Sequence, residues 1–278
     1  MDKTFDTLKE NNFAFKKHFG QNFITDTNLL EAICTDANLQ NNDQVLEIGT
    51  GAGTLTKVMS KHVKKVLTVE IDNELRPVLK QTFEGYNNIE LCFADFMKVS
   101  NSEVNNHFNG QFKVVANLPY YITTPIIFKL IGENFNVSSI TIMVQKEVAE
   151  RLCADCGTKD YGSMTAQVQS VADVSLKRIV NKKMFTPVPK VDSAIVNINL
   201  NYKKFNIKDL NFHGKVIECA FSMRRKTLSN CLKAKLGLTQ SKIDVIFEKL
   251  NLLPSCRGEQ LSVEQFVQLS NLILQLKD

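Results

Sequence analysis

The sequence contains no run of apolar residues near the roughly 20 that a membrane-spanning helix requires. It begins Met1-Asp2-Lys3-Thr4, which opens no apolar signal segment, so we expect a cytoplasmic protein rather than an exported one. It also has no internal repeat and no low-complexity segment. Its 278 residues are 44% hydrophobic and 23% charged, as in ordinary globular proteins, which argues against a disordered or fibrous chain.

Signs of metal, redox or phosphate chemistry are also scarce. The seven cysteines are odd in number and scattered, which suits a reducing compartment better than a disulfide framework. Cys153-Ala-Asp-Cys156 has the spacing of a redox or zinc motif, but no second such pair exists, and two cysteines at a helix end explain it as well. The four histidines are isolated, and no Walker lysine follows a glycine loop. We therefore predict no metal site.

The charge is unevenly distributed along the chain. Residues 200–278 hold 13 Lys and Arg against 7 Asp and Glu, a net charge of +6, whereas residues 1–199 carry −1. A basic C-terminal segment indicates a polyanionic partner, although a solvated lysine surface would look the same.

Short β-branched runs alternate with mixed, helix-like segments in the first half of the chain. The pattern predicts strands at 45–48, 66–70, 89–93, 112–116 and 140–144, with helices at 28–37, 54–61 and 73–83 among them. Such alternation indicates a doubly wound α/β fold with a mostly parallel sheet. Residues 173–180 and 191–200 read as two further strands that form an antiparallel hairpin at one edge.

The pattern becomes helical after Leu200. Apolar residues recur at helical spacing in 216–221, 228–236, 243–250 and 263–276. Ser262 and Gln265 form a capping box at the start of the last helix, and Leu261 and Phe266 are placed as a hydrophobic staple. We predict a mobile arm at 1–20, an α/β domain at 21–200 and a small helical domain at 201–278.

Candidate binding residues follow three successive strands. Gly49, Gly51 and Gly53 occupy a GxGxG loop after the first strand, where a backbone can approach a ligand closely. Glu70 ends the second strand and can accept both ribose hydroxyls, and Asp95 after the third can accept a hydrogen bond from an adenine amine. Their neighbours Ile71 and Phe96 could enclose the purine ring. Together these residues favour an adenosine-containing ligand, although both acids could instead be helix caps.

Asn117-Leu118-Pro119-Tyr120 directly follows the fourth strand and resembles the (N/D)PP(Y/F) loop of amino-methyltransferases that use S-adenosylmethionine. An adenine amine is a poor nucleophile because its lone pair is delocalised into the ring. The Asn117 side-chain oxygen and the Leu118 carbonyl can accept its two hydrogens and offset the positive charge that develops on nitrogen. Pro119 fixes the backbone, and Tyr120 offers a ring on which the base can stack. A turn without chemistry is the alternative.

The motifs together resemble those of the KsgA-type (RsmA) small-subunit ribosomal RNA adenine dimethyltransferases. They are, in order, Phe19 to Ile24, the glycine loop, Glu70, Asp95, Asn117 to Thr123, Val144 to Arg151, Phe185 to Ala194 and Arg224 to Leu228. The resemblance implies a Rossmann-like seven-stranded methyltransferase domain that binds S-adenosylmethionine through Asn22, Ile24, Gly49, Glu70, Asp95 and Asn117, with Gly51, Ile71 and Phe96 beside them. Ile24 stands where the family more often has Leu, a swap of similar size.

The same resemblance implies that Tyr120 and Phe185 hold the target adenine. Two adjacent adenosines near the 3′ end of small-subunit rRNA would be dimethylated during ribosome biogenesis, on a pre-ribosomal particle and by a monomeric enzyme. We expect Arg224, Arg225 and Lys226 to contact the RNA. Two alternatives are the related large-subunit methyltransferases of macrolide resistance, which have Asn-Ile-Pro-Tyr at the reacting loop, and a non-catalytic binding protein descended from the family.

Overall fold

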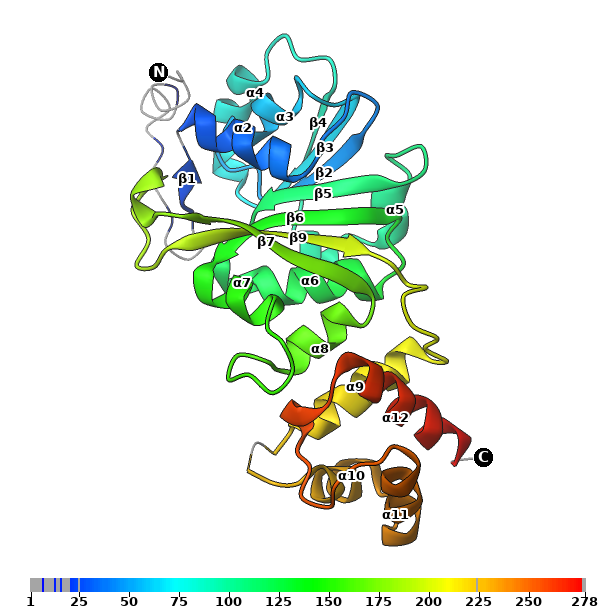
Figure 1. Cartoon of the computed structure of the whole chain (residues 1–278). Coiled ribbons are helices and arrows are strands. Elements are labelled where there is room, and N and C mark those ends of the chain that lie inside the picture. Colours follow the sequence, from blue (N-terminus) through cyan, green and yellow to red (C-terminus); the bar gives the residue numbers. More distant parts are fainter. Residues whose placement is uncertain are drawn as a thin grey trace. The chain divides into compact units, whose positions relative to one another are not determined.

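The computed structural model describes residues 7, 13, 16, 21–24, 26–223 and 225–276. The chain forms two compact units, Met1–Ala149 with Ser175–Leu200, and Glu150–Val174 with Asn201–Asp278 (Figure 1). The chain passes between the units after Ala149, after Val174 and after Leu200. Residues 150–174 group with the C-terminal helices, because Tyr161 and Ala166 are buried in that unit's core. The arm expected at 1–20 falls almost wholly outside the described residues.

The first unit is built on a seven-stranded sheet in the order β4-β3-β2-β5-β6-β9-β7. Its strands are β2 (Gln44–Ile48), β3 (Lys65–Glu70), β4 (Ile89–Phe93), β5 (Phe112–Asn117), β6 (Val137–Gln145), β7 (Ala172–Val180) and β9 (Ser193–Leu200). Neighbouring strands from β4 to β6 are parallel, and β9 is antiparallel to β6. This confirms the predicted seven-stranded, mostly parallel sheet with β7 and β9 at one side.

Because the strands are parallel, the loops that follow them lie at the same edge of the sheet. The carboxyl ends of β2, β3, β4 and β5 all meet one edge of the sheet, so the residues that follow these strands come together. The central strand β2 is paired on both sides, and Val45, Leu46, Glu47 and Ile48 are buried. A fully covered strand explains the continuous apolar run in the sequence, which Glu47 alone interrupts.

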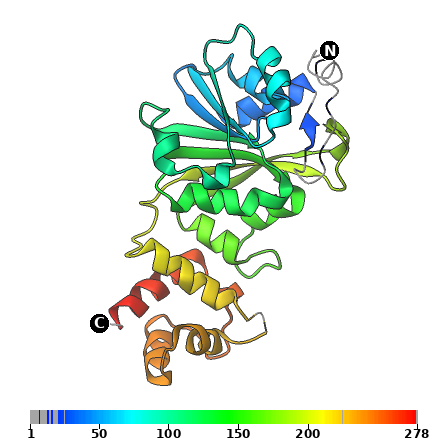
Figure 2. The ribbon, with the colours of Figure 1, turned by 180° about the vertical axis from the view of Figure 1, so that it is seen from behind.

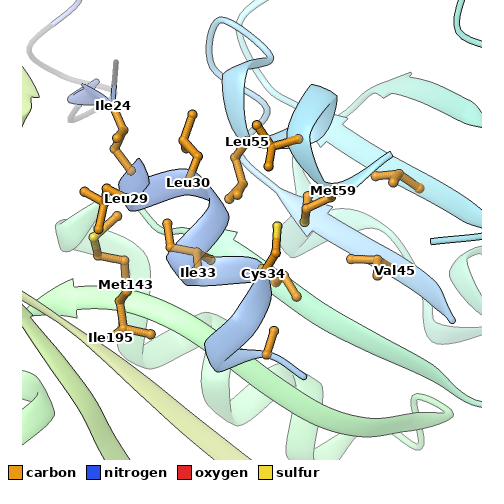
Figure 3. Close-up of a cluster of buried hydrophobic side chains, with 14 of the residues drawn as sticks. Ile24, Leu29, Leu30, Ile33, Cys34, Val45, Leu55, Met59, Met143 and Ile195 are labelled. Atoms are coloured by element: carbon orange, nitrogen blue, oxygen red, sulfur yellow. The ribbon is translucent and has the colours of Figure 1, made fainter. Parts of the chain in front are cut away.

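Helices cover both faces of this sheet (Figures 1 and 2). The helices and turns of the first half are α2 (Thr27–Asp36), α3 (Thr54–Met59), η2 (Asn73–Leu75), α4 (Arg76–Thr82), η3 (Phe96–Lys98), α5 (Asn101–Asn105), η4 (Tyr120–Ile122), α6 (Thr123–Gly132) and α7 (Lys146–Leu152). On one face, α2 packs Leu30 and Ile33 toward side chains of α3 and of the sheet (Figure 3). Figures 1 and 2 show α6 on the opposite face. The fold is thus doubly wound, as predicted.

A second, two-stranded sheet was not expected from the sequence. β1 (Phe23–Ile24) pairs antiparallel with β8 (Phe185–Thr186), which follows the turn η5 (Lys182–Met184). Ile24 lies opposite Phe185, and both side chains are buried in the same apolar cluster. Two-residue strands have no detectable alternation, so periodicity could not reveal this pairing.

The second unit is helical. It contains α8 (Ser163–Gln169), α9 (Leu210–Phe221), α10 (Leu228–Leu236), α11 (Gln240–Lys249), η6 (Gly258–Gln260) and α12 (Val263–Gln275). The predicted capping box is present: Gln265 N–H donates to Ser262 Oγ (3.2 Å), and Ser262 N–H donates to Gln265 Oε1 (2.9 Å). Leu261 and Phe266 are both buried in this unit's core. In the described part of the chain, no helix has the length and apolar character needed to span a bilayer.

Candidate active site at the carboxyl edge of the sheet

A cleft lies at the sheet edge where β2, β3 and β5 end. Its wall consists of four chain segments, and the residues that line it are Gln21 to Ile24, Glu47, Gly49 to Ala52, Thr54, Leu55, Glu70, Ile71 and Asn117 to Tyr120. The structure thus brings together most of the side chains predicted to bind the cofactor and to act on the amine. They come from positions almost 100 residues apart in the sequence.

The loop after β2 requires its glycines. Gly49, Gly51 and Gly53 all have positive φ, at +82°, +56° and +80°. A Cβ atom at Gly51 would lie 3.0 Å from the Phe23 ring, and one at Gly53 would lie 2.7 Å from the Phe83 ring. The glycines therefore let both aromatic rings pack against the loop and keep its backbone at the cleft surface.

Glu70 holds this loop from the end of β3. Its Oε2 accepts the Gly51 N–H (2.8 Å), and its Oε1 accepts the Asp72 N–H (2.8 Å). The side chain is only 5% exposed, and this burial raises the pKa of Glu70 above its ordinary value, while the backbone donors act in the opposite direction. The Ile71 N–H also acts on the carboxylate, so three backbone donors use part of its roughly four lone-pair positions, and capacity remains for a ligand hydroxyl.

Asp72, just beyond Glu70, connects β3 to the N-terminal segment. Lys16 Nζ lies 2.8 Å from its Oδ1, and Gln21 Nε2 donates to its Oδ2 (2.9 Å). Burial acts to raise the pKa of Asp72, but hydrogen bonds from Lys16, Glu74 N–H and Gln21 hold it below its usual value. An ionised Asp72 thus fixes Gln21, which lines the cleft beside Asn22.

Glu47 is a cleft residue that the sequence interpretation missed. Thr56 Oγ1 and Thr68 Oγ1 both donate to Glu47 Oε2, the second at 2.6 Å, and burial raises the pKa of Glu47 to about 8. Both bonds use the same oxygen, and within the described part of the chain no donor reaches Oε1. The available signal was an acidic residue inside an apolar strand directly before the glycine loop.

Asn117 ends β5 with its amide held in one orientation. Its Nδ2 donates to the Asn22 carbonyl (3.0 Å), so Oδ1 points the other way, and no donor among the described residues occupies that oxygen. The next residue, Leu118, donates its N–H to the Met143 carbonyl (3.3 Å), and its own carbonyl likewise accepts no hydrogen bond from the described chain. Two residues that line the cleft therefore each keep an acceptor, Asn117 Oδ1 and Leu118 O, that no described residue occupies.

Tyr120 is fixed by a partner from a distant strand. Its hydroxyl lies 2.6 Å from Ser193 Oγ, at the start of β9, where Ser193 is fully buried. Burial raises the pKa of Tyr120, and the bond to Ser193 opposes this rise. The ring lines the cleft, and its neighbour Tyr121 is 58% exposed. Ser193 lies within the Phe185 to Ala194 motif, but sequence spacing does not predict its pairing with Tyr120.

Three residues predicted to contact a ligand, Asp95, Phe96 and Phe185, do not line the cleft. Asp95 caps η3 by accepting the Met97 N–H (3.0 Å), and neither it nor Phe96 is among the residues that line the cleft. The Phe96 ring is buried, 6.0 Å from the Phe135 ring between centroids. Phe185 is 1% exposed within the α2-side cluster. For these three residues contact with a ligand stays a prediction, and Phe185 would have to change its exposure to touch a base.

The basic motif belongs to the second unit. Arg225 and Lys226 lie in the turn between α9 and α10, both exposed, and Lys226 N–H donates to the Met223 carbonyl (2.9 Å). Arg224 lies outside the described residues. RNA contact by these three residues therefore stays a prediction.

These features define a Rossmann-like methyltransferase. They are the sheet order, the glycine loop after β2, the acid at the end of β3 and the Asn-Leu-Pro-Tyr segment at the end of β5. The comparisons with known proteins narrow this class. The family described as "Ribosomal RNA adenine dimethylase" matches residues 12–275, and the chain belongs to this family.

Individual relatives agree with the family match. The chain is 42% identical to the "Ribosomal RNA small subunit methyltransferase A" of Clostridium acetobutylicum over 95% of both chains. Its identity to the protein of the same name from Bacillus cereus is 41%, over 98% of this chain and 96% of the relative. A dimethyladenosine transferase from Plasmodium falciparum superposes with a TM-score of 0.72 at 29% identity, over 92% of this chain and 97% of that one.

A second solved structure is similar in fold alone. The 23S rRNA methyltransferase ErmE superposes with a TM-score of 0.69 at 24% identity, over 91% of this chain and all of that one. The fold is thus shared with a 23S rRNA methyltransferase and does not by itself identify the RNA on which this chain acts.

Proposed function

We propose that the protein transfers methyl groups from S-adenosylmethionine to the exocyclic amines of two adjacent adenosines near the 3′ end of small-subunit rRNA. The observation that carries this proposal is the pair of open acceptors at Asn117 Oδ1 and Leu118 O, held at the edge of a cleft with a glycine loop and a buried acid. The curated relatives at about 40% identity, named as small-subunit methyltransferases, support the choice of ribosomal subunit.

The cleft fits the cofactor by the chemistry of its donors and acceptors. Glu70 retains acceptor capacity for a ribose hydroxyl, Gly49 and Gly51 line the cleft, and Ile71 offers an apolar surface that is 40% exposed. Glu47 adds a carboxyl group beside the glycine loop; its raised pKa keeps it mostly neutral near pH 7, and a cationic ligand beside it would favour its ionised form. When bound, S-adenosylmethionine supplies a methyl group on a sulfonium, which is a good leaving group.

The chain's own residues then act by orientation. Asn117 Oδ1 and Leu118 O accept the two amine hydrogens in the first transfer, and one of them accepts the single remaining hydrogen in the second. These bonds turn the nitrogen lone pair away from the ring system and stabilise the positive charge that develops on nitrogen. Asn22 keeps the Asn117 amide from rotating, and Ser193 keeps the Tyr120 ring in place for stacking against the base. The reaction needs no general base before the bond forms, because the proton leaves a cationic nitrogen.

The test is mass spectrometry of rRNA from small subunits of a strain that lacks this modification, incubated with the protein and S-adenosylmethionine. We expect two dimethyladenosines in one 3′-terminal fragment of the small-subunit rRNA. Methylation of large-subunit rRNA instead would favour the macrolide-resistance type of enzyme, and no methylation of either RNA would favour a binding protein.

Asn117→Ala provides the sharpest variant for the same assay. Loss of one positioned acceptor should lower turnover about 100- to 1000-fold, with rRNA and cofactor affinities nearly unchanged. Asn88→Ala is the matched control, because Asn88 Nδ2 also donates to backbone carbonyls, of Ser60 and Val63, at the opposite end of the sheet. Turnover of Asn117→Ala within about threefold of wild type would refute the amine-orienting role.

A further inference from the structure

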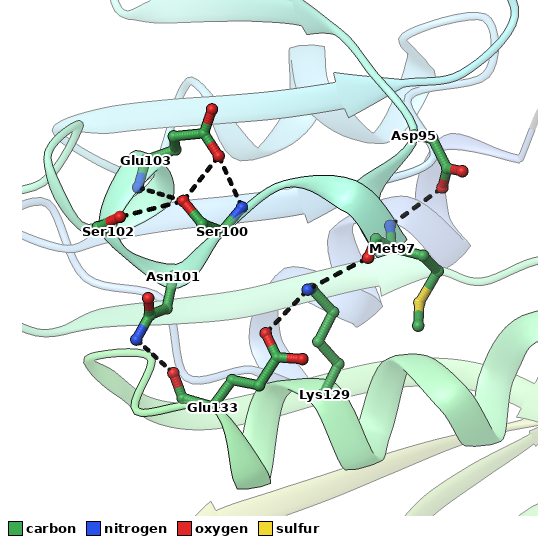
Figure 4. Close-up of polar contacts among 8 residues, drawn as sticks. All are labelled: Asp95, Met97, Ser100, Asn101, Ser102, Glu103, Lys129 and Glu133. Carbon is green, nitrogen blue, oxygen red and sulfur yellow. Dashed lines mark hydrogen bonds and ion pairs between the residues drawn. The ribbon is translucent and has the colours of Figure 1, made fainter.

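Lys129 is a buried lysine in the middle of α6. Its side chain is 6% exposed, and its ammonium lies 2.8 Å from Glu133 Oε2 on the next turn of the helix (Figure 4). The same ammonium lies 5.9 Å from the centroid of the Phe96 ring and 5.8 Å from that of Phe135. Placing a lysine here costs desolvation free energy that a methionine of similar length would avoid.

The fourth neighbour of this ammonium is a backbone atom of η3. Lys129 Nζ donates to the Met97 carbonyl (3.4 Å), and the Met97 N–H donates to Asp95 Oδ1 (3.0 Å). Met97 is therefore held at its N–H by the Asp95 carboxylate and at its carbonyl by the Lys129 ammonium (Figure 4). Phe96, between the two anchored positions, is held through its ring as well.

This arrangement leaves one carboxylate oxygen of Asp95 able to accept a hydrogen bond from a ligand. Oδ1 accepts the Met97 N–H, while among the described residues Oδ2 has Lys98 as its one partner, at 3.7 Å and with an exposed side chain. The direction of Oδ2 depends on the orientation of η3, and Lys129 on the neighbouring helix α6 donates a hydrogen bond to a carbonyl of this turn. Since α6 follows directly on η4 and the Asn-Leu-Pro-Tyr loop, one helix supports both the reacting loop and the Asp95 turn.

We propose that Lys129 is a positioning residue for cofactor selectivity: it holds the η3 turn so that Asp95 Oδ2 accepts the 6-amino group of the cofactor's adenine. This inference rests on the proposed function, because it assumes an adenosyl ligand in the cleft. It adds a residue of α6 that belongs to none of the quoted motifs and that decides how well a 6-aminopurine is distinguished from a purine without the amine.

The test measures binding rather than turnover. Dissociation constants are determined by calorimetry on the full chain for S-adenosylhomocysteine and for its analogue with hydrogen in place of the 6-amino group. We expect the wild type to prefer the amine-bearing ligand by about 10- to 100-fold, since a site built for an N–H rejects a ligand that lacks it. Lys129→Met should lower this preference about fivefold or more, mainly by weakening the amine-bearing ligand.

Lys113→Met is the matched control. Lys113 is also partly buried, pairs with Asp43 (2.7 Å) and donates to a backbone carbonyl, that of Asn38 (2.7 Å), near the amino end of β5. The Lys113→Met substitution should lower the free energy of unfolding by a comparable amount and leave the ligand preference unchanged. Lys129→Arg, which keeps the charge and the donors, should stay near the wild-type preference.

The outcomes separate this inference from the proposed function. Failure of the wild type to bind S-adenosylhomocysteine would overturn both. Binding without preference for the amine, or a preference that Lys129→Met leaves intact, would overturn the positioning role alone. If Lys129→Met does not fold, Lys129→Gln replaces it, because its shorter amide does not reach Met97, and an unchanged preference there is equally decisive against the role.

Discussion

Single side chains in the cleft are held by hydrogen bonds at one atom and leave a second polar atom open. Asn117 donates with one end of its amide and is open at the other, and Glu47 accepts twice on one oxygen and not on the second. Residue type could be predicted from sequence at Asn117, because the motif carries it. The open atom could not, because it depends on the Asn22 carbonyl, 95 residues away.

Glu70→Ala gives the first prediction at this scale. The substitution removes two potential contacts to a ribose and also the bonds to Gly51 and Asp72 N–H. We expect a loss of about 1–3 kcal/mol, hence cofactor binding that is about 5- to 150-fold weaker by calorimetry. Glu90→Ala is the control, since Glu90 pairs with Lys65 and His107 at the amino end of the strands. Unchanged affinity in Glu70→Ala would remove Glu70 from the site.

Among the elements, those with strong local signals were predictable. The seven strands, the helix from Leu228 to Leu236 and the capped helix after Ser262 match the structure, because apolar period and capping residues are local properties. The pairing of β1 with β8 and the burial of Phe185 were not predictable, because they depend on contacts between segments far apart in sequence. The same reason explains why residues 150–174 group with the C-terminal helices.

A buried histidine connects three elements of the second unit and predicts a pH effect. His213 on α9 lies 2.8 Å from Ser170 Oγ, just after α8, and 2.9 Å from Ser270 Oγ on α12. Burial lowers the pKa of His213 to about 4. The unfolded chain takes up a proton near pH 6.5 and the folded chain does not, so stability is complete above 6.5 and falls as the pH drops toward 4.

The expected loss from His213 is roughly 3 kcal/mol across that window. It is measured as the free energy of unfolding of the second unit's transition, in urea, at pH values between 4 and 7. His213→Gln should flatten the dependence, whereas His62→Gln should not, since His62 is a half-exposed partner of Glu31. Equal slopes in wild type and His213→Gln would show that another group titrates.

At the scale of the whole molecule, the two units divide the charge differently from the sequence halves. Residues 150–174 hold 2 Lys and Arg against 4 Asp and Glu, so the second unit carries +4 rather than the +6 of its C-terminal segment. The stretch 175–200 holds 5 Lys and Arg against one Asp and gives the first unit a basic segment of its own. A polyanion therefore finds positive charge on both units.

Salt dependence measures how far the turn after α9 contributes. Arg225→Glu with Lys226→Glu should weaken binding to the small subunit and reduce the slope of log affinity against log salt by about 1–2, while cofactor affinity stays unchanged. The control is Lys61→Glu with Lys64→Glu, an equal charge change between α3 and β3, at the amino end of the sheet. An unaltered slope in the first variant would place the RNA elsewhere, as on the Lys16-Lys17 segment or on 175–200.

The pairing of β1 with β8 can form only late in the synthesis of the chain. Ile24 and Phe185 lie opposite each other although about 160 residues separate them in the chain. The segment that lines the cleft at Asn22 and Phe23 therefore acquires its neighbouring strand only after most of the first unit has left the ribosome. A nascent chain that has completed β2 to β5 already carries the glycine loop, Glu70 and Asn117, yet one wall of its cleft is still without β8. We expect the Asn22 and Phe23 wall of the cleft to be held in place only once β8 has been made.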